Sequence, residues 1–188
     1  MERVRSFVAI LLSEEVRAAI AAEIARLRPL APRVSWVSPP NLHLTLKFLG
    51  ELPPETFEQV KEGLTAAVAG AAPFSLHFCG LGAFPGMARP RVVWVGVDDG
   101  GQAAQALQAR VEAALTPRGF AREERPYSPH LTIGRVRVPR GLAELQQAMA
   151  RDARVEFGRL QVGGLSLMRS DLSPAGSRYT ELAAFAFP

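Results

Sequence analysis

The first half of the chain alternates between the apolar spacing of strands and that of helices. The stretch over 4–11, which is apolar without interruption from Phe7 onward, is typical of a buried strand. Val16, Ile20 and Ile24 then recur at helical spacing after Ser13, a residue type that caps helix N-termini well. The pattern predicts, in order, a strand over 4–11, a helix from Ser13 to Pro29, strands over 34–37 and 42–49, a helix between Pro53 and Gly70, a strand that begins at Phe74, a loop over 80–90 and a strand over 91–98.

The second half follows a similar order after a glycine pair at 100–101. Leu107, Val111 and Leu115 lie on one face of a third predicted helix. An irregular stretch then reaches Pro129. The remaining pattern predicts a strand over 130–138, a helix over 141–151, a strand-like stretch over 155–168 with a bend at 163–164, a loop over 171–177 and a last strand over 178–187.

The shared order of elements indicates an internal repeat, approximately residues 13–98 and 101–187, within a single domain of residues 1–188. Short strands separated by helices in this order favour an α+β fold in which antiparallel sheets are backed by helices. We therefore expect a bilobal molecule, with two lobes related by a pseudo-two-fold axis and a cleft between them.

Two of the three histidines stand in nearly the same local sequence. The residues from His43 read His-Leu-Thr-Leu, and those from His130 read His-Leu-Thr-Ile. Because side chains alternate along a strand, His43 and Thr45 share one face while the leucines share the other, and His130 and Thr132 do the same. A two-fold axis would bring both His-Thr pairs to the central cleft.

Two imidazoles and two hydroxyls around one space suit phosphodiester chemistry. A neutral imidazole can take a proton from an attacking water, and a protonated one can give a proton to a departing sugar oxygen. Histidine serves both tasks because its ordinary pKa is about 6.5. Threonine hydroxyls can donate hydrogen bonds to the phosphate oxygens. This scheme requires no metal and no cofactor, and the chain lacks a convincing metal-ligand pattern.

A single histidine in a half-buried strand is usually structural, but two matching His-x-Thr motifs in a chain with three histidines are poorly explained by chance. The third histidine, His77, has no threonine two residues later. We interpret it as a surface or partly hydrogen-bonded residue.

These motifs resemble those of the two-histidine phosphoesterase superfamily, and most closely its RNA 2′,3′-cyclic phosphodiesterases, also called 2′-5′ RNA ligases. The likeness extends over essentially the whole chain. The stretches that carry it are 36–37, 41–50, 84–85, 91–94, 127–135 and Tyr179.

The resemblance implies a bilobal fold with the site in the central cleft. It also implies hydrolysis of an RNA 2′,3′-cyclic phosphate to a 2′-phosphate, with a possible reverse reaction that joins RNA halves through a 2′-5′ bond without nucleotide energy. By this analogy His43 donates a proton to the 3′ oxygen and His130 is the base for water. The residues alone leave these two roles interchangeable.

Four further residues carry open expectations. Arg135 matches a phosphate-contacting arginine of the family, although strict alternation would turn it toward the core unless the glycine before it marks a bulge. Lys47 would share a face with His43, as a phosphate ligand or as a solvated edge lysine. Tyr127 is a candidate for stacking on a base. Phe48 alternates onto the core side and is expected to pack there.

Charge and composition narrow the partners. The net charge is +4, and all but two of the 22 basic residues are arginine, which fits phosphate in a bidentate way. The expected substrates are RNA ends or nucleotides that carry a 2′,3′-cyclic phosphate. Two alternatives remain: a cyclic phosphodiesterase for small nucleotides or ADP-ribose cyclic phosphate, and a non-catalytic RNA-binding module.

The sequence also supports expectations about the cellular compartment and the oligomeric state of the protein. The chain has one cysteine, so no internal disulfide can form, and this favours the cytoplasm. It has no apolar run of about 20 residues that could cross a bilayer. We expect a monomer that does not associate with membranes.

Overall fold

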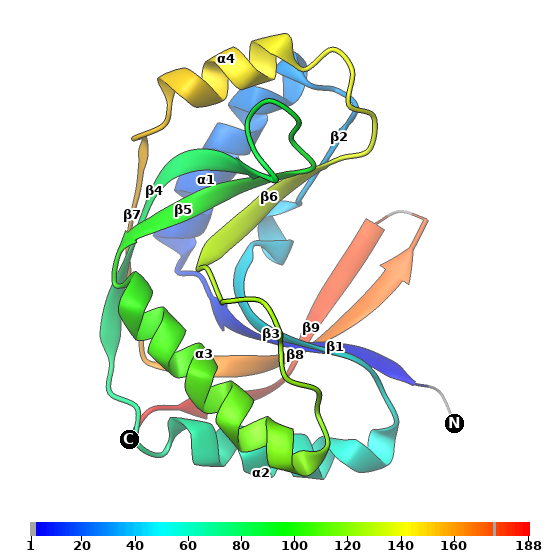
Figure 1. The fold of residues 1–188 in the computed structure, drawn as a ribbon, viewed down its shortest axis with the longest axis vertical. Coiled ribbons are helices and arrows are strands. Elements are labelled where there is room, and N and C mark those ends of the chain that lie inside the picture. The colour runs from blue at the N-terminus through cyan, green and yellow to red at the C-terminus, as the bar shows by residue number, and fades with distance from the viewer. Residues whose placement is uncertain (1–2, 175) are drawn as a thin grey trace.

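The computed structural model describes residues 3–174 and 176–188, and it has the expected bilobal α+β architecture (Figure 1). The strands are β1 (Val4–Leu11), β2 (Val34–Trp36), β3 (His43–Leu52), β4 (Phe74–Phe84), β5 (Val92–Asp99), β6 (His130–Val136), β7 (Glu156–Val162), β8 (Gly164–Ser173) and β9 (Gly176–Ala186). The helices are α1 (Glu14–Leu27), α2 (Phe57–Val68), α3 (Gly101–Leu115) and α4 (Ala143–Arg151), with short 3₁₀ turns at Arg28–Leu30, Pro39–Asn41, Pro54–Thr56 and Thr116–Arg118.

The strands form two antiparallel sheets. Sheet A has the order β3-β1-β8-β9, and sheet B has the order β2-β6-β5-β4-β7. Each sheet therefore takes strands from both halves of the chain, and the lobes are not the two sequence halves. The repeat over 13–98 and 101–187 remains a prediction about the sequence.

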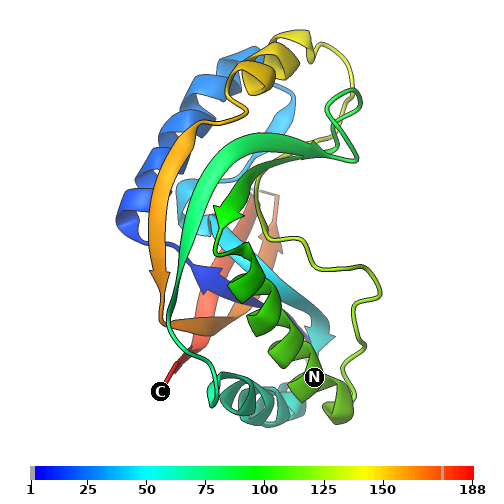
Figure 2. The same cartoon turned by 60° about the vertical axis from the view of Figure 1, so that its left-hand side comes forward.

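The helices cover the outer face of each sheet. Helices α2 and α3 pack on each other and on sheet A, whereas α1 contacts β7 and α4 contacts β4 in sheet B (Figures 1 and 2). Helix α1 follows a strand of sheet A but packs on sheet B, so the chain crosses between the lobes from its first helix onward. None of the helices in the described ranges is long and apolar enough to cross a membrane.

Helix α1 illustrates how the sequence pattern becomes packing. The Ser13 side chain accepts a hydrogen bond from the Val16 amide at 3.4 Å, which caps the helix as predicted. Val16, Ile20, Ile24 and Leu27 are all buried against sheet B. Burial of each large aliphatic side chain contributes about 1.5–3 kcal/mol, so this stripe holds the helix in place.

A single hydrophobic core runs through both lobes. It joins Val8 of β1, Leu64 of α2, Phe78 of β4 and Leu131 of β6. A smaller cluster of Phe7, Ala9 and Met168, with Leu11 and Tyr179 packed against it, lies on the other face of sheet A. Sheet A is therefore covered by apolar side chains on both faces near β1.

Two loop predictions were wrong. The loop expected over 80–90 begins later, because β4 continues to Phe84. Gly80 has a φ of +76° and lies in a register shift between Phe78 and Leu81, so a bulge carries the strand through the glycines. The loop expected over 171–177 is also shorter, because β8 and β9 form a hairpin in which Ser173 pairs with Gly176. This hairpin projects from the lobe, so its polar sequence reflects exposure (Figure 1).

The strand-like stretch over 155–168 was expected to bend at 163–164. It is two strands in different sheets, β7 at one edge of sheet B and β8 inside sheet A. The break at Gly163 carries the chain from one lobe to the other. Periodicity alone does not distinguish a bent strand from two strands in separate sheets, because both have the same alternation.

Candidate active site

The first His-x-Thr motif ends on a β-bulge in strand β3. Thr45 pairs with Ala9 of β1, and Lys47 pairs with Val8, which leaves Leu46 as an extra residue. His43 and Thr45 share one half-buried face of the strand, as predicted, while Leu46 is buried. The face of each sheet that carries its His-x-Thr motif is here called the cleft face. After the bulge the alternation is reversed, because the extra residue changes the phase of the strand.

The second motif ends on a bulge at the equivalent position in strand β6. Thr132 pairs with Trp94 of β5, and Gly134 pairs with Val93, which leaves Ile133 as the extra residue. The two motifs therefore share both their sequence and their local backbone irregularity.

The bulges decide where the residues after each motif point. Arg135 is exposed on the cleft face of sheet B and does not face the core. The equivalent position in β3 is Phe48, whose side chain is 62% exposed, so the expectation that it packs in the core was wrong. Lys47 was expected on the cleft face with His43, and this was also wrong, because the bulge turns it inward.

The His43 ring is fixed by two hydrogen bonds and two aromatic contacts. Its Nδ1 lies 2.7 Å from the carbonyl oxygen of Asn41, and its Nε2 lies 2.9 Å from Thr45 Oγ1. Phe7 packs on the ring with centroids 4.7 Å apart, and Tyr179 meets it edge-on at 5.2 Å. No pattern in the sequence pointed to Phe7, because it lies inside an apolar run.

The His130 ring has the same backbone contact and a different aromatic neighbour. Its Nδ1 lies 2.8 Å from the carbonyl oxygen of Ser128, again two residues upstream. Phe84 meets this ring edge-on at 4.8 Å, and Trp94 packs beside Phe84 at 5.4 Å. Trp94 thus packs within sheet B.

The shared Nδ1 contact sets the tautomer of both rings. A carbonyl oxygen only accepts hydrogen bonds, so Nδ1 of His43 and of His130 must each carry a proton. The Nε2 atom of each ring is then the one that can gain or lose a proton. In the neutral form of His43, Nε2 accepts a hydrogen bond from the Thr45 hydroxyl.

The electrostatics connect the two motifs. Burial lowers the pKa of His43 below its usual range, and the positive charge of Arg135 lowers it further, whereas the hydrogen bond to Asn41 raises it. Arg135 belongs to β6 and His43 to β3, and these two strands are in contact although they lie in different sheets. Arg135 and His43 therefore share one electrostatic environment across the lobes.

Lys47 is buried in an ion pair behind the site. Its Nζ lies 2.9 Å from both carboxylate oxygens of Glu112 on α3 and donates to the carbonyl oxygen of Ala121 at 2.7 Å. Only 4% of its side chain is exposed. The three N–H groups are directed at these three oxygens, so we do not include Lys47 among the phosphate contacts.

Tyr127 has a partner that the sequence could not indicate. Its hydroxyl donates to the main-chain carbonyl of Thr45 at 2.8 Å, and burial raises its pKa. The Gln105 side chain donates to the carbonyl of Tyr127 at 3.1 Å. Tyr127 therefore ties the segment before His130 to the strand that carries His43, and its partly buried ring packs against the hydrophobic core; stacking on a base stays a prediction.

Other polar features lie away from the histidine motifs. His77 forms a 2.7 Å contact with Asp98 through Nδ1, which confirms a partly hydrogen-bonded histidine. Within 3–174 and 176–188, no group of three or more His, Cys, Asp or Glu side chains is arranged to hold a metal ion.

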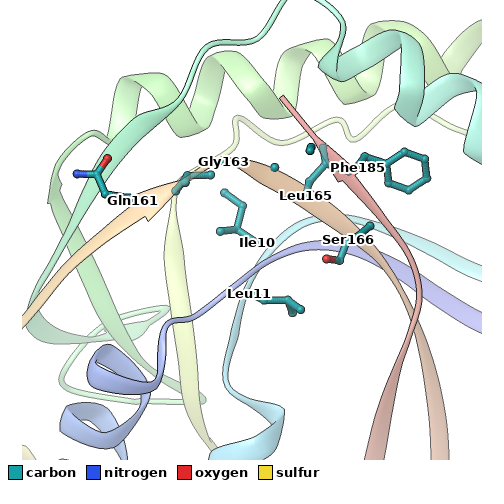
Figure 3. A pocket seen from close by; sticks show the side chains of 11 residues that line it. Ile10, Leu11, Gln161, Gly163, Leu165, Ser166 and Phe185 are labelled. Atoms are coloured by element: carbon teal, nitrogen blue, oxygen red, sulfur yellow. The ribbon is translucent and has the colours of Figure 1, made fainter. Parts of the chain in front are cut away.

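Two cavities lie away from the two histidine motifs. One, of about 280 Å³, forms where β7 passes into β8, with Ile10, Leu165 and Phe185 around it (Figure 3). The other, of about 520 Å³, lies between α3 and the segment 122–127. Neither is lined by His43 or His130.

Known proteins share this sequence and fold. The family model described as the 2′-5′ RNA ligase superfamily matches residues 16–174. An RNA 2′,3′-cyclic phosphodiesterase of Methanothermobacter thermautotrophicus is 36% identical, over 97% of this chain and 98% of its own. The crystal structure of TT0787 of Thermus thermophilus has a TM-score of 0.77 and 34% identity, with 97% of both chains covered. The structure of E. coli LigT complexed with 3′-AMP has a TM-score of 0.78 and 27% identity, with 99% of both chains covered.

Proposed function

Because this chain belongs to the 2′-5′ RNA ligase superfamily, we propose that it hydrolyses the 2′,3′-cyclic phosphate at an RNA end to a 2′-phosphomonoester. His43 and His130 act as the acid–base pair, and no metal takes part. The relatives named RNA 2′,3′-cyclic phosphodiesterase support the reaction, and the two matching histidine sites support the mechanism.

The observation that carries the mechanism is the duplicated geometry of the two rings. Each Nδ1 donates to a carbonyl two residues upstream, at 2.7 Å for His43 and 2.8 Å for His130. Each ring is thereby held with Nε2 as its exchangeable position. A fixed tautomer is what proton transfer in both directions requires, because one ring must accept a proton while the other donates one.

Two proton transfers accompany the opening of the cyclic phosphate. Nε2 of the neutral ring accepts a proton from water as its oxygen forms a bond to phosphorus. Nε2–H of the protonated ring donates to the 3′ oxygen as the bond between that oxygen and phosphorus breaks. The phosphate stays on the 2′ oxygen, and proton exchange with solvent restores both rings. The family resemblance assigns donation to His43 and the base role to His130.

The donor role requires His43 to gain a proton when the substrate binds. In the free protein, burial and Arg135 lower the pKa of His43, which favours the neutral ring. A phosphate anion beside Arg135 and His43 would act in the opposite direction, because a nearby negative charge stabilises the imidazolium. His43 therefore becomes protonated, and able to act as the acid, when the substrate binds.

Thr45 can follow this change of protonation. It donates its hydroxyl proton to Nε2 while the ring is neutral, across the 2.9 Å contact. Once Nε2 is protonated, the ring donates and the hydroxyl oxygen accepts. The hydroxyl proton of Thr45 is then free for a phosphate oxygen, and Thr132 and Arg135 offer donors from the other sheet.

The same site permits ligation. A 5′-hydroxyl in place of water would attack phosphorus and displace the 3′ oxygen, which leaves a 2′-5′ linkage. No nucleotide cofactor is needed, because the strained ring bond is exchanged for the new one. Since both motifs lie on one chain, a monomer contains all the proposed catalytic groups. The single cysteine is compatible with the cytoplasm as the place where it acts.

Product analysis tests this function directly. An oligonucleotide that ends in a 2′,3′-cyclic phosphate is incubated with the protein, and the position of the phosphate is read by ³¹P NMR or by digestion with a 3′-specific phosphatase. The expected product carries the phosphate on the 2′ oxygen. A 3′-phosphate, or an unchanged cyclic end, would contradict the proposal.

A further inference from the structure

The cleft faces of the two sheets differ in charge. On sheet B, Arg135 follows His130 and Thr132 on the same face of β6, because the bulge at Ile133 resets the alternation, and Arg137 comes directly after the last residue of the strand, Val136. Both arginines are exposed. The two arginines are separated by one residue, so both lie beyond the catalytic threonine along the direction of the chain.

Strand β2 adds a third arginine to this row. Val34 pairs with Val136, and Ser35 pairs with Arg135. Antiparallel register then brings Arg33, one residue before the strand, alongside Arg137. Arg33 is exposed, so three exposed arginines, Arg33, Arg135 and Arg137, here called the arginine track, gather where β6 meets the edge strand β2.

The charges of the arginine track are not neutralised within the described ranges. Arg17, Arg26, Arg159 and Arg169 each form an ion pair with a carboxylate. The three arginines of the track form none with the carboxylates of residues 3–174 and 176–188. Exposed guanidinium groups without acidic partners are available to phosphate oxygens.

Sheet A has no comparable row beside its histidine. Its cleft face carries Phe7, Met168 and Tyr179, which pack together, and the acidic Glu181, which accepts a hydrogen bond from Ser166 at 2.6 Å. An anionic chain would meet aromatic and acidic side chains near His43, because Arg5 of the same face lies toward the other end of β1, six residues before Leu11, which pairs with His43. The charge pattern therefore gives a bound strand one favourable exit, over sheet B.

We propose that the RNA strand behind the cyclic phosphate lies along β6 over the arginine track, so that the enzyme favours an oligonucleotide end over a cyclic mononucleotide. This inference rests on the proposed function, because it places the strand relative to the same two histidines. It names the substrate class as single-stranded RNA several nucleotides long. Small nucleotides would use the histidines without reaching Arg33 or Arg137.

Binding and turnover test the inference separately. The variant Arg33→Gln/Arg137→Gln removes two charges of the track and leaves Arg135 in place. The matched control is Arg5→Gln, an exposed arginine on the cleft face of sheet A. Binding of a fluorescein-labelled oligonucleotide that ends in a 2′-phosphate is measured by anisotropy as a function of salt, which requires no catalysis.

We expect the double variant to bind this oligonucleotide about tenfold more weakly, and the slope of log affinity against log salt to fall by about 1.4, or 0.7 for each lost phosphate contact on a single strand. In turnover, the ratio of kcat/KM for a cyclic-phosphate oligonucleotide to that for a 2′,3′-cyclic mononucleotide should fall by a similar factor. Arg5→Gln should leave both the slope and the ratio unchanged.

The proposal that RNA lies over the arginine track would be overturned if the salt slope were unchanged in the double variant, or if Arg5→Gln weakened binding equally. Loss on both substrates in the same proportion would also overturn it, because it would indicate damage to the site itself. Failure of the wild-type protein to open either substrate would overturn the proposed function instead, and the binding measurement would still decide whether RNA lies on the track.

Discussion

The hydroxyl of Tyr127 donates a hydrogen bond to the main-chain carbonyl of Thr45 at 2.8 Å. This contact joins the segment that ends in His130 to the strand that carries His43. Lys47 adds a second tie a few residues away, because it holds both the Glu112 carboxylate and the Ala121 carbonyl. These two contacts thus fix the path of the chain between the two catalytic motifs.

Tyr127→Phe should impair catalysis more than binding. The change removes one hydrogen bond and leaves the Thr45 carbonyl without its partner, so the free energy of unfolding should fall by about 1–2 kcal/mol. Since His130 would be less well fixed relative to His43, kcat should fall while KM stays near its wild-type value. Steady-state kinetics beside a urea titration check this, and wild-type kcat in a destabilised variant would limit Tyr127 to a structural role.

Lys47→Met should destabilise the fold strongly. The change leaves the Glu112 carboxylate buried without its counter-charge, which costs about 3–5 kcal/mol when one partner of a buried pair is lost. The double variant Lys47→Met/Glu112→Leu should recover most of the lost stability, because both charges are then absent. Urea unfolding measures all three proteins.

An exposed pair provides the control for this cycle. Lys61 and Glu58 are 2.8 Å apart on the surface of α2. Lys61→Met should change the free energy of unfolding by less than about 0.5 kcal/mol, as is usual for exposed pairs on a helix. A loss for Lys47→Met no larger than that for Lys61→Met would show that the buried pair does not stabilise the fold.

His43→Ala and His130→Ala should each lower kcat by at least about 100-fold, the usual size of an acid–base contribution. His77→Ala is the matched control, since His77 lies on β4 and contacts Asp98. Its activity should equal that of the wild type. Wild-type rates in either of the first two variants would refute the acid–base assignment.

Arg135→Gln should raise the pKa of His43, because it removes a positive charge that disfavours the imidazolium. Imidazole NMR signals followed over a pH titration measure this change directly. Burial would still hold the pKa of the variant below its ordinary value. An unchanged His43 titration would show that Arg135 does not act on the ring.

The same shift makes stability depend on pH. The pKa of His43 is lower in the folded state than in the unfolded chain, so the unfolded chain binds more protons between the two values. This contribution to stability is present above the unfolded pKa and is lost as the pH falls through the window down to the folded pKa. In Arg135→Gln the window narrows, and the loss on acidification, measured by urea unfolding at a series of pH values, should be smaller.

Activity should persist in excess EDTA, because the proposed mechanism transfers protons between imidazoles and water only. The check is a rate measurement on the cyclic-phosphate oligonucleotide before and after dialysis against chelator. A loss that is restored by added divalent metal would overturn the metal-free scheme.

The sequence was sufficient for most of the elements and for the paired histidines. Strand β1 has the predicted bounds, and α1 begins after its Ser13 cap, because both depend on local spacing and capping. The shared faces of His43 with Thr45 and of His130 with Thr132 also followed from strict alternation.

The positions of Lys47 and Arg135 could not be obtained in this way. Each lies just after a bulge, and a bulge is defined by the register with a partner strand, Val8 for Lys47 and Val92 for Arg135. The partner of Tyr127 was equally hidden, because Thr45 is distant in sequence. Local periodicity carries no information about which strands become neighbours.

The exchange of strands between the sheets bears on how this protein could be divided. A fragment ending near Gly100 would contain β1 and β3 but lack β8 and β9, the other strands of the same sheet. The fragment that begins after Gly100 would have β8 and β9 but lack β1 and β3. Neither fragment could complete a sheet by itself, but the two mixed together would supply each other's missing strands. We therefore expect complementation, in which the separated pieces stay unstructured alone and regain the native fold only as a non-covalent pair.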